Sequence, residues 1–123
     1  MRLEIRRVVV FVRDMEVQAR FYREVLGLPL VLNPDDEAQF VEFEAGGCRL
    51  ALHSGGLPSR AKRPTKLVFY AQDVAAARAW LASRGAKLGK VKSTAVDLAD
   101  GSRLQLCDGQ DPEGNPFQLS NRV

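Results

Sequence analysis

An internal repeat constrains the fold of this chain more than any other feature. Each copy has a hydrophobic run, an aspartate, an aromatic residue and then a glycine, at 8–12, Asp14, Phe21 and Gly27 and again at 67–71, Asp73, Trp80 and Gly85. The aspartates and the aromatic residues both recur after 59 positions (73 − 14 and 80 − 21), close to half of the 123 residues. Because each copy would need the other to cover its sheet, the repeat predicts a chain made of two modules, with the functional site at the seam between them.

The middle of the chain separates these two modules. Residues 55–64 are rich in Gly, Pro, Ser, Lys and Arg, a composition typical of a linker. We therefore expect a first module at about 1–54 and a second at about 65–123. The length suits one compact unit, so residues 1–123 are expected to form a single domain with two subdomains.

The first module is expected to contain one helix and four strands. Residues 4–12 are rich in Val and Ile, as in a buried strand. Asp14 is suited to cap a helix over about 14–26, whose apolar stripe ends at Gly27, a residue type favoured at helix C-termini. The remaining strands are expected at 28–32, 38–44 and 48–53, with turns at 33–36 and 45–47.

The second module repeats this order. A strand over 65–71 precedes Asp73, which is expected to cap a helix with Trp80 on its inward face. Residues 95–100 fit two alternatives, a strand edge or an extra hairpin that turns at Asp100–Gly101. The remaining strands are expected at about 87–92, 102–107 and 115–121.

Charge and composition argue against several classes of protein. The formal net charge is +3 and the pI about 9.1, but no basic helix, aromatic stacking motif or zinc finger accompanies the basic residues. They therefore indicate a solvated surface and no nucleic-acid partner. No apolar run approaches the about 20 residues of a membrane span, and the charged residues 1–7 do not resemble a signal peptide. We expect a cytoplasmic protein in which Cys48 and Cys107 are reduced, buried thiols.

Four motifs are specific enough to compare with known families: Asp14, Phe21–Tyr22, Leu26–Gly27–Leu28 and the segment DPEGNPFQL at 111–119. Together they resemble the vicinal oxygen chelate superfamily, which holds glyoxalase I, extradiol dioxygenases, methylmalonyl-CoA epimerase and the fosfomycin and bleomycin resistance proteins. The resemblance implies an α+β fold in which two βαβββ modules form an incomplete barrel around a cleft, with the helices outside. Members share this fold and differ in chemistry, so the motifs specify the reaction poorly.

The resemblance also implies a position for a metal. Metal-using relatives place a His at the start of each module's first strand and a Glu on its last strand. In this sequence the four positions hold Arg7, Ala51, Lys66 and Gln118. A second register would put Gln105 in the place of Gln118. Charged Arg and Lys cannot bind a metal, and two cations would repel a divalent ion, so we expect no metal and no other cofactor.

The same substitutions favour a different ligand. If Arg7 and Lys66 project into the cup, they can hold a carboxylate, phosphate or enolate-like group beside the Gln118 amide. Strand alternation would then place four apolar side chains on the same side as these cations: Val9, Phe11, Val68 and Tyr70. Phe40 would join them if Glu42 faces the cup. Alternatively, each first strand begins a residue or two later and both cations lie at its exposed end.

His53 is the only histidine and lies two residues beyond Ala51, on the same face of the strand. It is a candidate general base. It is also a candidate metal ligand, if Glu42 or Glu44 on a neighbouring strand supplies a further donor. The alternative is a hydrogen-bonded, inert histidine at the mouth of the cleft.

Three functions are compatible with these residues. The first is a metal-independent protein that binds a small anionic or aromatic molecule, as bleomycin-resistance-like members do without a metal. The second is a lyase, isomerase or dioxygenase that uses His53, Glu42 or a metal site that the chosen register misses. The third is a structural partner or inactive paralogue. A homodimer is expected because two short modules leave open sheet edges, and the modules can pair within or between chains.

Overall fold

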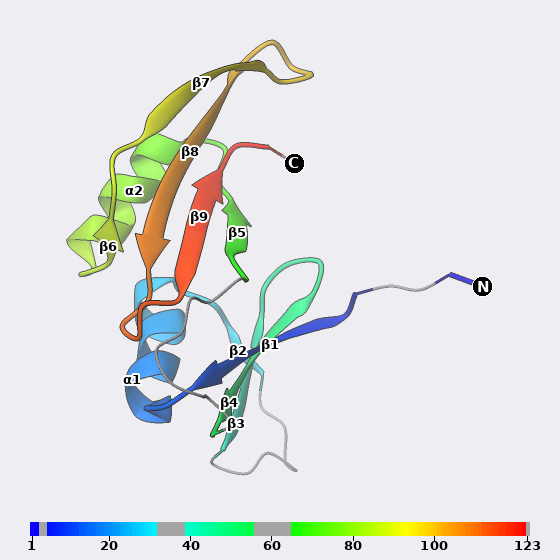
Figure 1. Cartoon of the computed structure of the whole chain (residues 1–123), viewed down its shortest axis with the longest axis vertical. Coiled ribbons are helices and arrows are strands. Elements are labelled where there is room, and N and C mark those ends of the chain that lie inside the picture. Colours follow the sequence, from blue (N-terminus) through cyan, green and yellow to red (C-terminus); the bar gives the residue numbers. More distant parts are fainter. Residues whose placement is uncertain (3–4, 32–38, 56–64, 123) are drawn as a thin grey trace. The chain divides into compact units, whose positions relative to one another are not determined.

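The computed structural model describes residues 1–2, 5–31, 39–55 and 65–122, and the chain divides into two compact units, Met1–Ala61 and Lys62–Val123. Each unit has a mixed β-sheet and helical structure, so the chain is an α+β protein (Figure 1). Within the described residues, no helix is long and apolar enough to cross a membrane. Several expected features lie outside the described residues: 56–64 of the linker, the turn at 33–36, and positions 4, 32 and 38 of three strands.

The first unit is built on a sheet with the strand order β1-β4-β3-β2. Its strands are β1 (Arg7–Val12), β2 (Leu30–Val31), β3 (Phe40–Glu44) and β4 (Arg49–Ser54). β4 lies between β1, to which it is parallel, and β3, to which it is antiparallel. Because parallel neighbours cannot be joined by a tight hairpin, the chain passes through the helical segment, β2 and β3 before it returns beside β1.

Asp14 caps the helical segment of the first unit, as the sequence predicted. Its carboxylate accepts a hydrogen bond from the Val17 N–H at 3.1 Å, at the start of α1 (Met15–Arg20). The chain continues as a π-helical turn, η1 (Phe21–Val25), and then reaches Gly27, whose φ of 72° suits glycine. The sequence predicted one continuous α-helix here, because an apolar stripe does not distinguish the hydrogen-bonding pattern of a π-helical turn from that of an α-helix.

The second unit has a sheet in which β5, β9, β8 and β6 are successive neighbours and β7 also pairs with β8. Its elements are β5 (Leu67–Tyr70), α2 (Val74–Ser83), β6 (Lys87–Leu88), β7 (Lys92–Asp97), β8 (Arg103–Gln110) and β9 (Pro116–Ser120). The Asp73 carboxylate caps α2 by accepting from the Ala76 N–H at 2.9 Å. β5 and β9 are parallel, as β1 and β4 are, so the first and last strands pair in the same way in both units.

The single strand predicted at 87–92 is interrupted. β6 ends at Leu88, the Gly89 N–H donates to the Asp108 carbonyl at 2.8 Å, and pairing with β8 resumes at Lys92 in β7. β6 and β7 are therefore two parts of one interrupted strand that runs alongside β8. A glycine inside a strand often marks such an irregularity.

Two turns of the second unit contain carboxylates with structural roles. Asp100 lies between β7 and β8 and accepts from the Ser102 hydroxyl at 2.6 Å and N–H at 2.9 Å, which lower the pKa of its carboxyl. The extra hairpin, one of the two alternatives for this segment, is therefore correct. Between β8 and β9, buried Asp111 accepts from the Glu113 and Asn115 N–H groups, each at 2.9 Å, so its carboxylate stabilises this turn.

Each sheet buries one face against helical structure of its own unit. In the first unit the rings of Tyr22 and Phe43 lie 6.4 Å apart, beside fully buried Leu52. In the second unit Phe69 and Phe117 form an edge-to-face pair at 6.1 Å. The opposite face of each sheet is therefore the one on which exposed site residues can lie.

Two side chains expected in the core are not buried. Trp80 is 49% exposed, and the Arg84 guanidinium lies 4.5 Å from the centre of its ring. Its neighbour Leu81 turns inward, as does Val74 at the start of α2. Cys48 is partly exposed, whereas Cys107 is buried, which raises the pKa of its thiol; both cysteines are free.

Gly109 occupies a tightly packed position on β8. A Cβ atom there would lie 2.5 Å from Phe117 Cζ and 2.8 Å from Leu88 Cδ2. We expect Gly109→Ala to lower the free energy of unfolding by about 1–3 kcal/mol, the usual cost of overpacking, as measured by chemical denaturation. Gly89→Ala is the matched control, because its nearest contact would be at 3.6 Å. Equal losses in both variants would contradict this packing.

Candidate functional site

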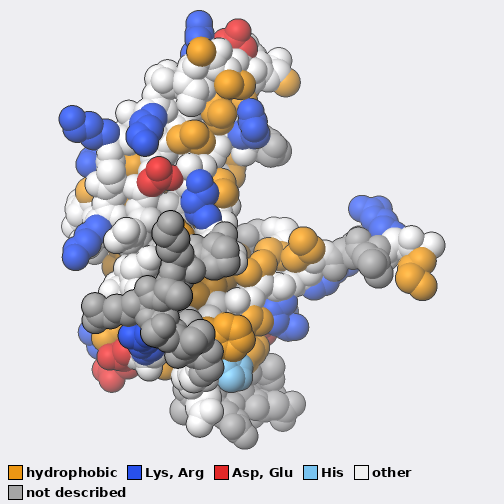
Figure 2. Space-filling view, in the orientation of Figure 1, with side chains coloured by type: hydrophobic (Ala, Val, Ile, Leu, Met, Phe, Trp, Pro, Cys, Tyr) orange, Lys and Arg blue, Asp and Glu red, His pale blue; other side chains and the backbone are white. Residues whose placement is uncertain are grey.

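The predicted site residues lie on the sheet face opposite the buried core, which we call the open face of each unit. Residues paired across neighbouring strands point to the same side of a sheet, so the ladders place these side chains in rows. Apolar side chains are exposed here: Val9 by 41%, Phe11 by 45%, Val68 by 56% and Tyr70 by 57%. Figure 2 shows exposed hydrophobic side chains on both units, with Lys and Arg spread among them.

The open face of the first unit has three rows across β1, β4 and β3. They are Phe11, His53 and Phe40; then Val9, Ala51 and Glu42; then Arg7, Arg49 and Glu44. The order runs from an aromatic row through a middle row to a charged row. The strand pairing thus places four of the predicted site residues on one face of the sheet: Arg7, Phe11, Phe40 and His53.

The aromatic row is packed around His53. Its ring centre lies 5.7 Å from that of Phe11 and 6.0 Å from that of Phe40, both steeply inclined. His53 Nδ1 lies 2.8 Å from the Ser54 carbonyl oxygen, which only accepts, so Nδ1 carries the proton in this contact. The row therefore offers an apolar, ring-lined surface in which His53 is already hydrogen-bonded.

Glu42 dominates the middle row, because it is completely buried despite its charge. It faces Ala51 across the β3–β4 ladder, and Ala51 faces Val9 across the next ladder. The small Ala51 side chain leaves room over β4, and the Glu42 carboxylate reaches across this strand to Arg7 on β1. A carboxylate from β3 thus lies beside the position that metal-using relatives fill from β4.

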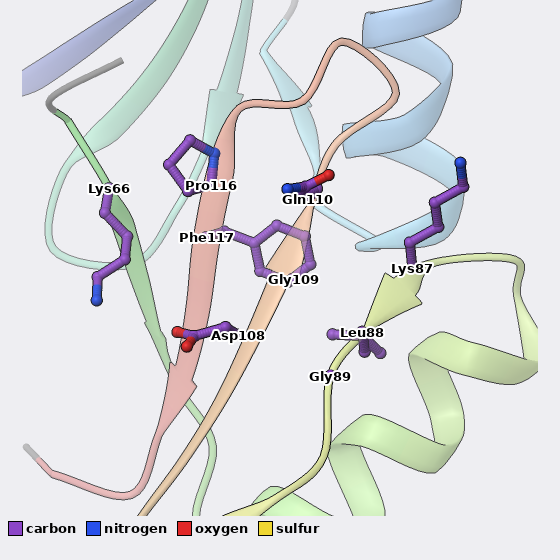
Figure 3. Close-up of a pocket in the computed structure, with 9 residues that line it drawn as sticks. All are labelled: Lys66, Lys87, Leu88, Gly89, Asp108, Gly109, Gln110, Pro116 and Phe117. Carbon is purple, nitrogen blue, oxygen red and sulfur yellow. The ribbon is translucent and has the colours of Figure 1, made fainter. Parts of the chain in front are cut away.

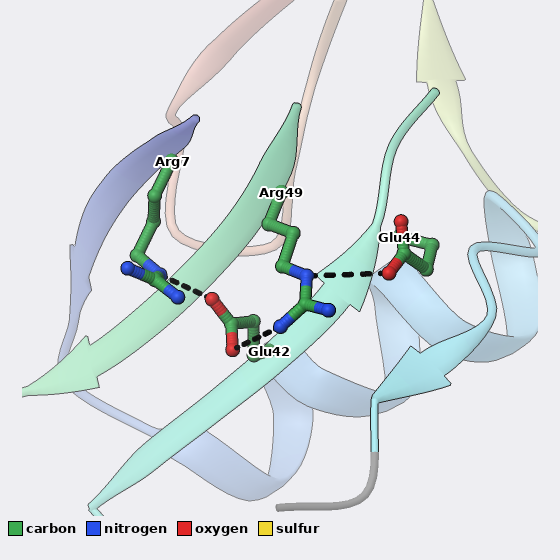
Figure 4. Close-up of polar contacts among 4 residues, drawn as sticks. All are labelled: Arg7, Glu42, Glu44 and Arg49. Atoms are coloured by element: carbon green, nitrogen blue, oxygen red, sulfur yellow. Dashed lines mark hydrogen bonds and ion pairs between the residues drawn. The ribbon is translucent and has the colours of Figure 1, made fainter. Parts of the chain in front are cut away.

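Two arginines hold Glu42 in place (Figure 4). Arg7 Nε donates to Glu42 Oε1, and Arg49 Nη1 lies 3.5 Å from Glu42 Oε2. Arg49 Nε also lies 3.2 Å from Glu44 Oε1. Two guanidiniums and two carboxylates leave this group without net charge, so the positive charge of Arg7 is compensated within the protein.

A cavity of about 390 Å³ adjoins the charged row at the turn between β3 and β4. It is lined by Arg6, Arg7, Glu44, Gly46, Gly47, Cys48 and Arg49. Three arginines border this cavity, but two of them already bind Glu42 or Glu44. An incoming anion would therefore compete with carboxylates of the protein.

The open face of the second unit has the same three rows across β5, β9 and β8. They are Tyr70, Ser120 and Leu106; then Val68, Gln118 and Asp108; then Lys66, Pro116 and Gln110, with Lys66 one residue before β5. Gln118 Nε2 donates to Asp108 Oδ1 at 2.8 Å. Gln118 pairs with Val68 as Ala51 pairs with Val9, so the register through Gln118 is correct and the alternative through Gln105 is wrong.

A larger cavity of about 530 Å³ lies at the end of this second sheet (Figure 3). Its lining consists of Lys66, Lys87, Leu88, Gly89, Asp108, Gly109, Gln110, Pro116 and Phe117. In Figure 3, Lys66 and Lys87 lie on opposite sides of Pro116 and Phe117. Within the described part of the chain, neither lysine has a hydrogen-bond or ion-pair partner.

The sequence did not reveal that the two units share a carboxylate at equivalent positions. Glu42 and Asp108 occupy equivalent ladder positions, opposite Ala51 and Gln118 respectively. Each unit thus keeps one carboxylate, on the strand next to the one used by metal-binding relatives. The signal in the sequence was one carboxylate within β3 and one within β8, Glu42 and Asp108. Their equivalence depends on a strand register that the sequence does not give. Arg49 was missed for the same reason.

The residues present do not fit the metal of the family. The four family positions hold two cations, a methyl group and an amide, namely Arg7, Lys66, Ala51 and Gln118. No group of three or more His, Cys, Asp or Glu side chains in the described residues is arranged to hold a metal ion. Glu42 is moreover engaged by two guanidiniums, which oppose a nearby divalent cation.

We expect Arg7→Ala to destabilise the first unit by about 1–3 kcal/mol, because it leaves a buried carboxylate with one of its two guanidinium partners. Chemical denaturation measures this change. Arg20→Ala is the matched control, since Arg20 pairs with Glu16 at 3.2 Å on the exposed surface and such pairs contribute little. If both variants are as stable as the unmodified protein, Glu42 does not depend on Arg7.

Comparisons with known proteins agree with this architecture. Residues 4–119 match the model of the Glyoxalase/Bleomycin resistance protein/Dioxygenase superfamily. No curated protein matches the chain. Among solved structures, the chain is similar to TnmS3, an antibiotic binding protein from a Streptomyces species, with 22% identity, a TM-score of 0.76, and coverage of 98% of this chain and 97% of that one.

Two further solved structures have the same fold. Lactoylglutathione lyase from Agrobacterium tumefaciens is 22% identical with a TM-score of 0.68, over 95% of this chain and 92% of that one. A virulence protein from Salmonella typhimurium is 23% identical with a TM-score of 0.72, over 100% and 99% of the two chains. These likenesses concern the fold, whereas the family match covers nearly the whole sequence. The chain therefore belongs to the glyoxalase/bleomycin resistance protein/dioxygenase superfamily.

Proposed function

We propose that this protein binds a small anionic or aromatic molecule without a metal, on the open faces of its modules. The observation that carries it is the pair of equivalent open faces, each with exposed apolar residues beside charged ones. TnmS3, which shares the fold, is an antibiotic binding protein.

The chemistry of the open faces supports a planar, largely apolar ligand body. Phe11 and Tyr70 occupy equivalent positions on β1 and β5 and are both about half exposed. A ligand can stack on exposed aromatic rings and bury its apolar surface against their aliphatic neighbours. Phe40, His53 and Gln118 extend these surfaces, and His53 Nε2 and the Gln118 amide supply polar contacts.

Catalysis by His53 or Glu42 is less well supported. Glu42 is bound by Arg7 and Arg49, so its carboxylate oxygens are already engaged within the protein. His53 lies among aromatic rings, and the described residues place no carboxylate on its Nδ1, which binds a backbone carbonyl. A lyase, isomerase or dioxygenase would need one of these groups to act as an acid, base or ligand.

Two measurements on protein purified without chelator test this function. Elemental analysis is expected to find no stoichiometric zinc, nickel, iron or manganese, and native mass spectrometry is expected to detect a co-purifying small molecule. One stoichiometric metal per chain would overturn the proposal. As a positive control, Lys66→His combined with Gln118→Glu places two family-type donors near Asp108, and we expect this variant to gain measurable zinc affinity.

We also infer a homodimer, because two small sheets leave open edges and exposed apolar faces that a second copy can cover. Light scattering at micromolar concentration is expected to give about twice the chain mass of 13.6 kDa. A mass near 13.6 kDa under these conditions would contradict the dimer.

A further inference from the structure

We propose that the cavity between Lys66 and Lys87 in the second unit is an anchor for the negatively charged group of an aromatic monoanion, such as an arene carboxylate. This inference rests on the proposed function and names where and how the charge of the ligand is held. The site lies at the end of the sheet, where β5 begins, β8 ends and β6 passes beside it.

Charge compensation differs between the two units at equivalent positions. In the first unit the charged row contains Arg7, Arg49 and Glu44, and its two arginines pair with carboxylates. In the second unit the positions of Arg49 and Glu44 are taken by Pro116 and Gln110, which are uncharged. The ion pairs that satisfy the first unit therefore have no counterpart in the second.

The cavity of the second unit is bordered by two cations that no described residue neutralises. Lys66 and Lys87 have no ion-pair partner in the described part of the chain. The carboxylate in the lining, Asp108, accepts a hydrogen bond from Gln118. Two ammonium groups against one carboxylate give the cavity a net charge of +1, which a ligand with one negative charge would neutralise.

The cavity also has an apolar floor. Pro116 and Leu88 line it and are partly exposed, whereas the lining residues Phe117 and Gly109 are buried. Gly89 exposes its backbone at the wall. A cavity of about 530 Å³ lies within the usual range for small-molecule sites, and it is large enough for one aromatic ring with a charged substituent. The flexible lysine stems can bring both ammonium groups to that substituent.

The test uses benzoate as the probe and benzamide as its neutral counterpart of the same shape. In two-dimensional ¹H–¹⁵N NMR spectra of the full chain, benzoate is expected to shift the Gly89 and Gly109 amide signals. Lys66→Gln and Lys87→Gln are each expected to weaken benzoate binding about threefold to tenfold, as loss of a charged hydrogen bond at a partly hydrated site does. Lys92→Gln, an exposed lysine of β7 outside the cavity, is the matched control and should bind normally.

Benzoate binding that shifts the two glycine signals, exceeds benzamide binding and weakens in both cavity variants supports the anchor. Absence of shifts at Gly89 and Gly109, equal binding of benzoate and benzamide, or equal weakening in Lys92→Gln would each overturn it. The same spectra report whether the variants are folded. Failure of the anchor is distinct from failure of the proposed function, which elemental analysis decides without any probe.

Discussion

The Glu42 carboxylate, buried between Arg7 and Arg49, is the interaction on which the open face of the first unit depends. Burying a carboxylate is costly, and the cost is offset only when cations and hydrogen bonds surround it. The three side chains come from three neighbouring strands, so the network also fixes how β1, β4 and β3 align. A slip of one residue in any of these strands would turn its charge toward the helical side.

This network of ion pairs lies where metal-using relatives of the superfamily place metal donors. Where relatives place a His and a Glu around an ion, this chain places Arg7 and Ala51, and the carboxylate of Glu42 takes the space. The first unit satisfies its charges internally. The second unit keeps the equivalent carboxylate, Asp108, but pairs it with an amide, so its lysines remain available to a ligand. The two units thus have similar open faces whose charges are compensated differently.

The sequence predicted the features that local chemistry determines. The helix caps at Asp14 and Asp73 could be predicted because they depend only on the spacing between each aspartate and the apolar stripe that follows it. The repeat offset placed Val68 in the position of Val9, as the ladders confirm. The strand predicted at 65–71 begins only at Leu67, so Lys66 lies one residue before it. The hairpin at Asp100 followed from its turn residues.

Features that depend on contacts between distant segments were not predicted. Nothing in the apolar stripe of the helix indicates a π-helical turn, and the exposure of Trp80 follows from which face of α2 meets the sheet. The ion pairs of Arg7 depend on Glu42, 35 residues away on a strand that is not its ladder neighbour. Arg7 was therefore interpreted as a ligand-binding cation, whereas in the structure Glu42 compensates its charge.

A crystal structure with 4-bromobenzoate would test the central claim most directly, because anomalous scattering from bromine locates the ligand independently of the protein. That claim is that the second unit, and not the first, offers an uncompensated positive charge to an anion. We predict that the carboxylate lies between Lys66 and Lys87 with the ring over Pro116, while Glu42 stays bound to its two arginines. A carboxylate bound by Arg7 and Arg49 with Glu42 displaced, or a metal ion ligated at the family position, would contradict the account.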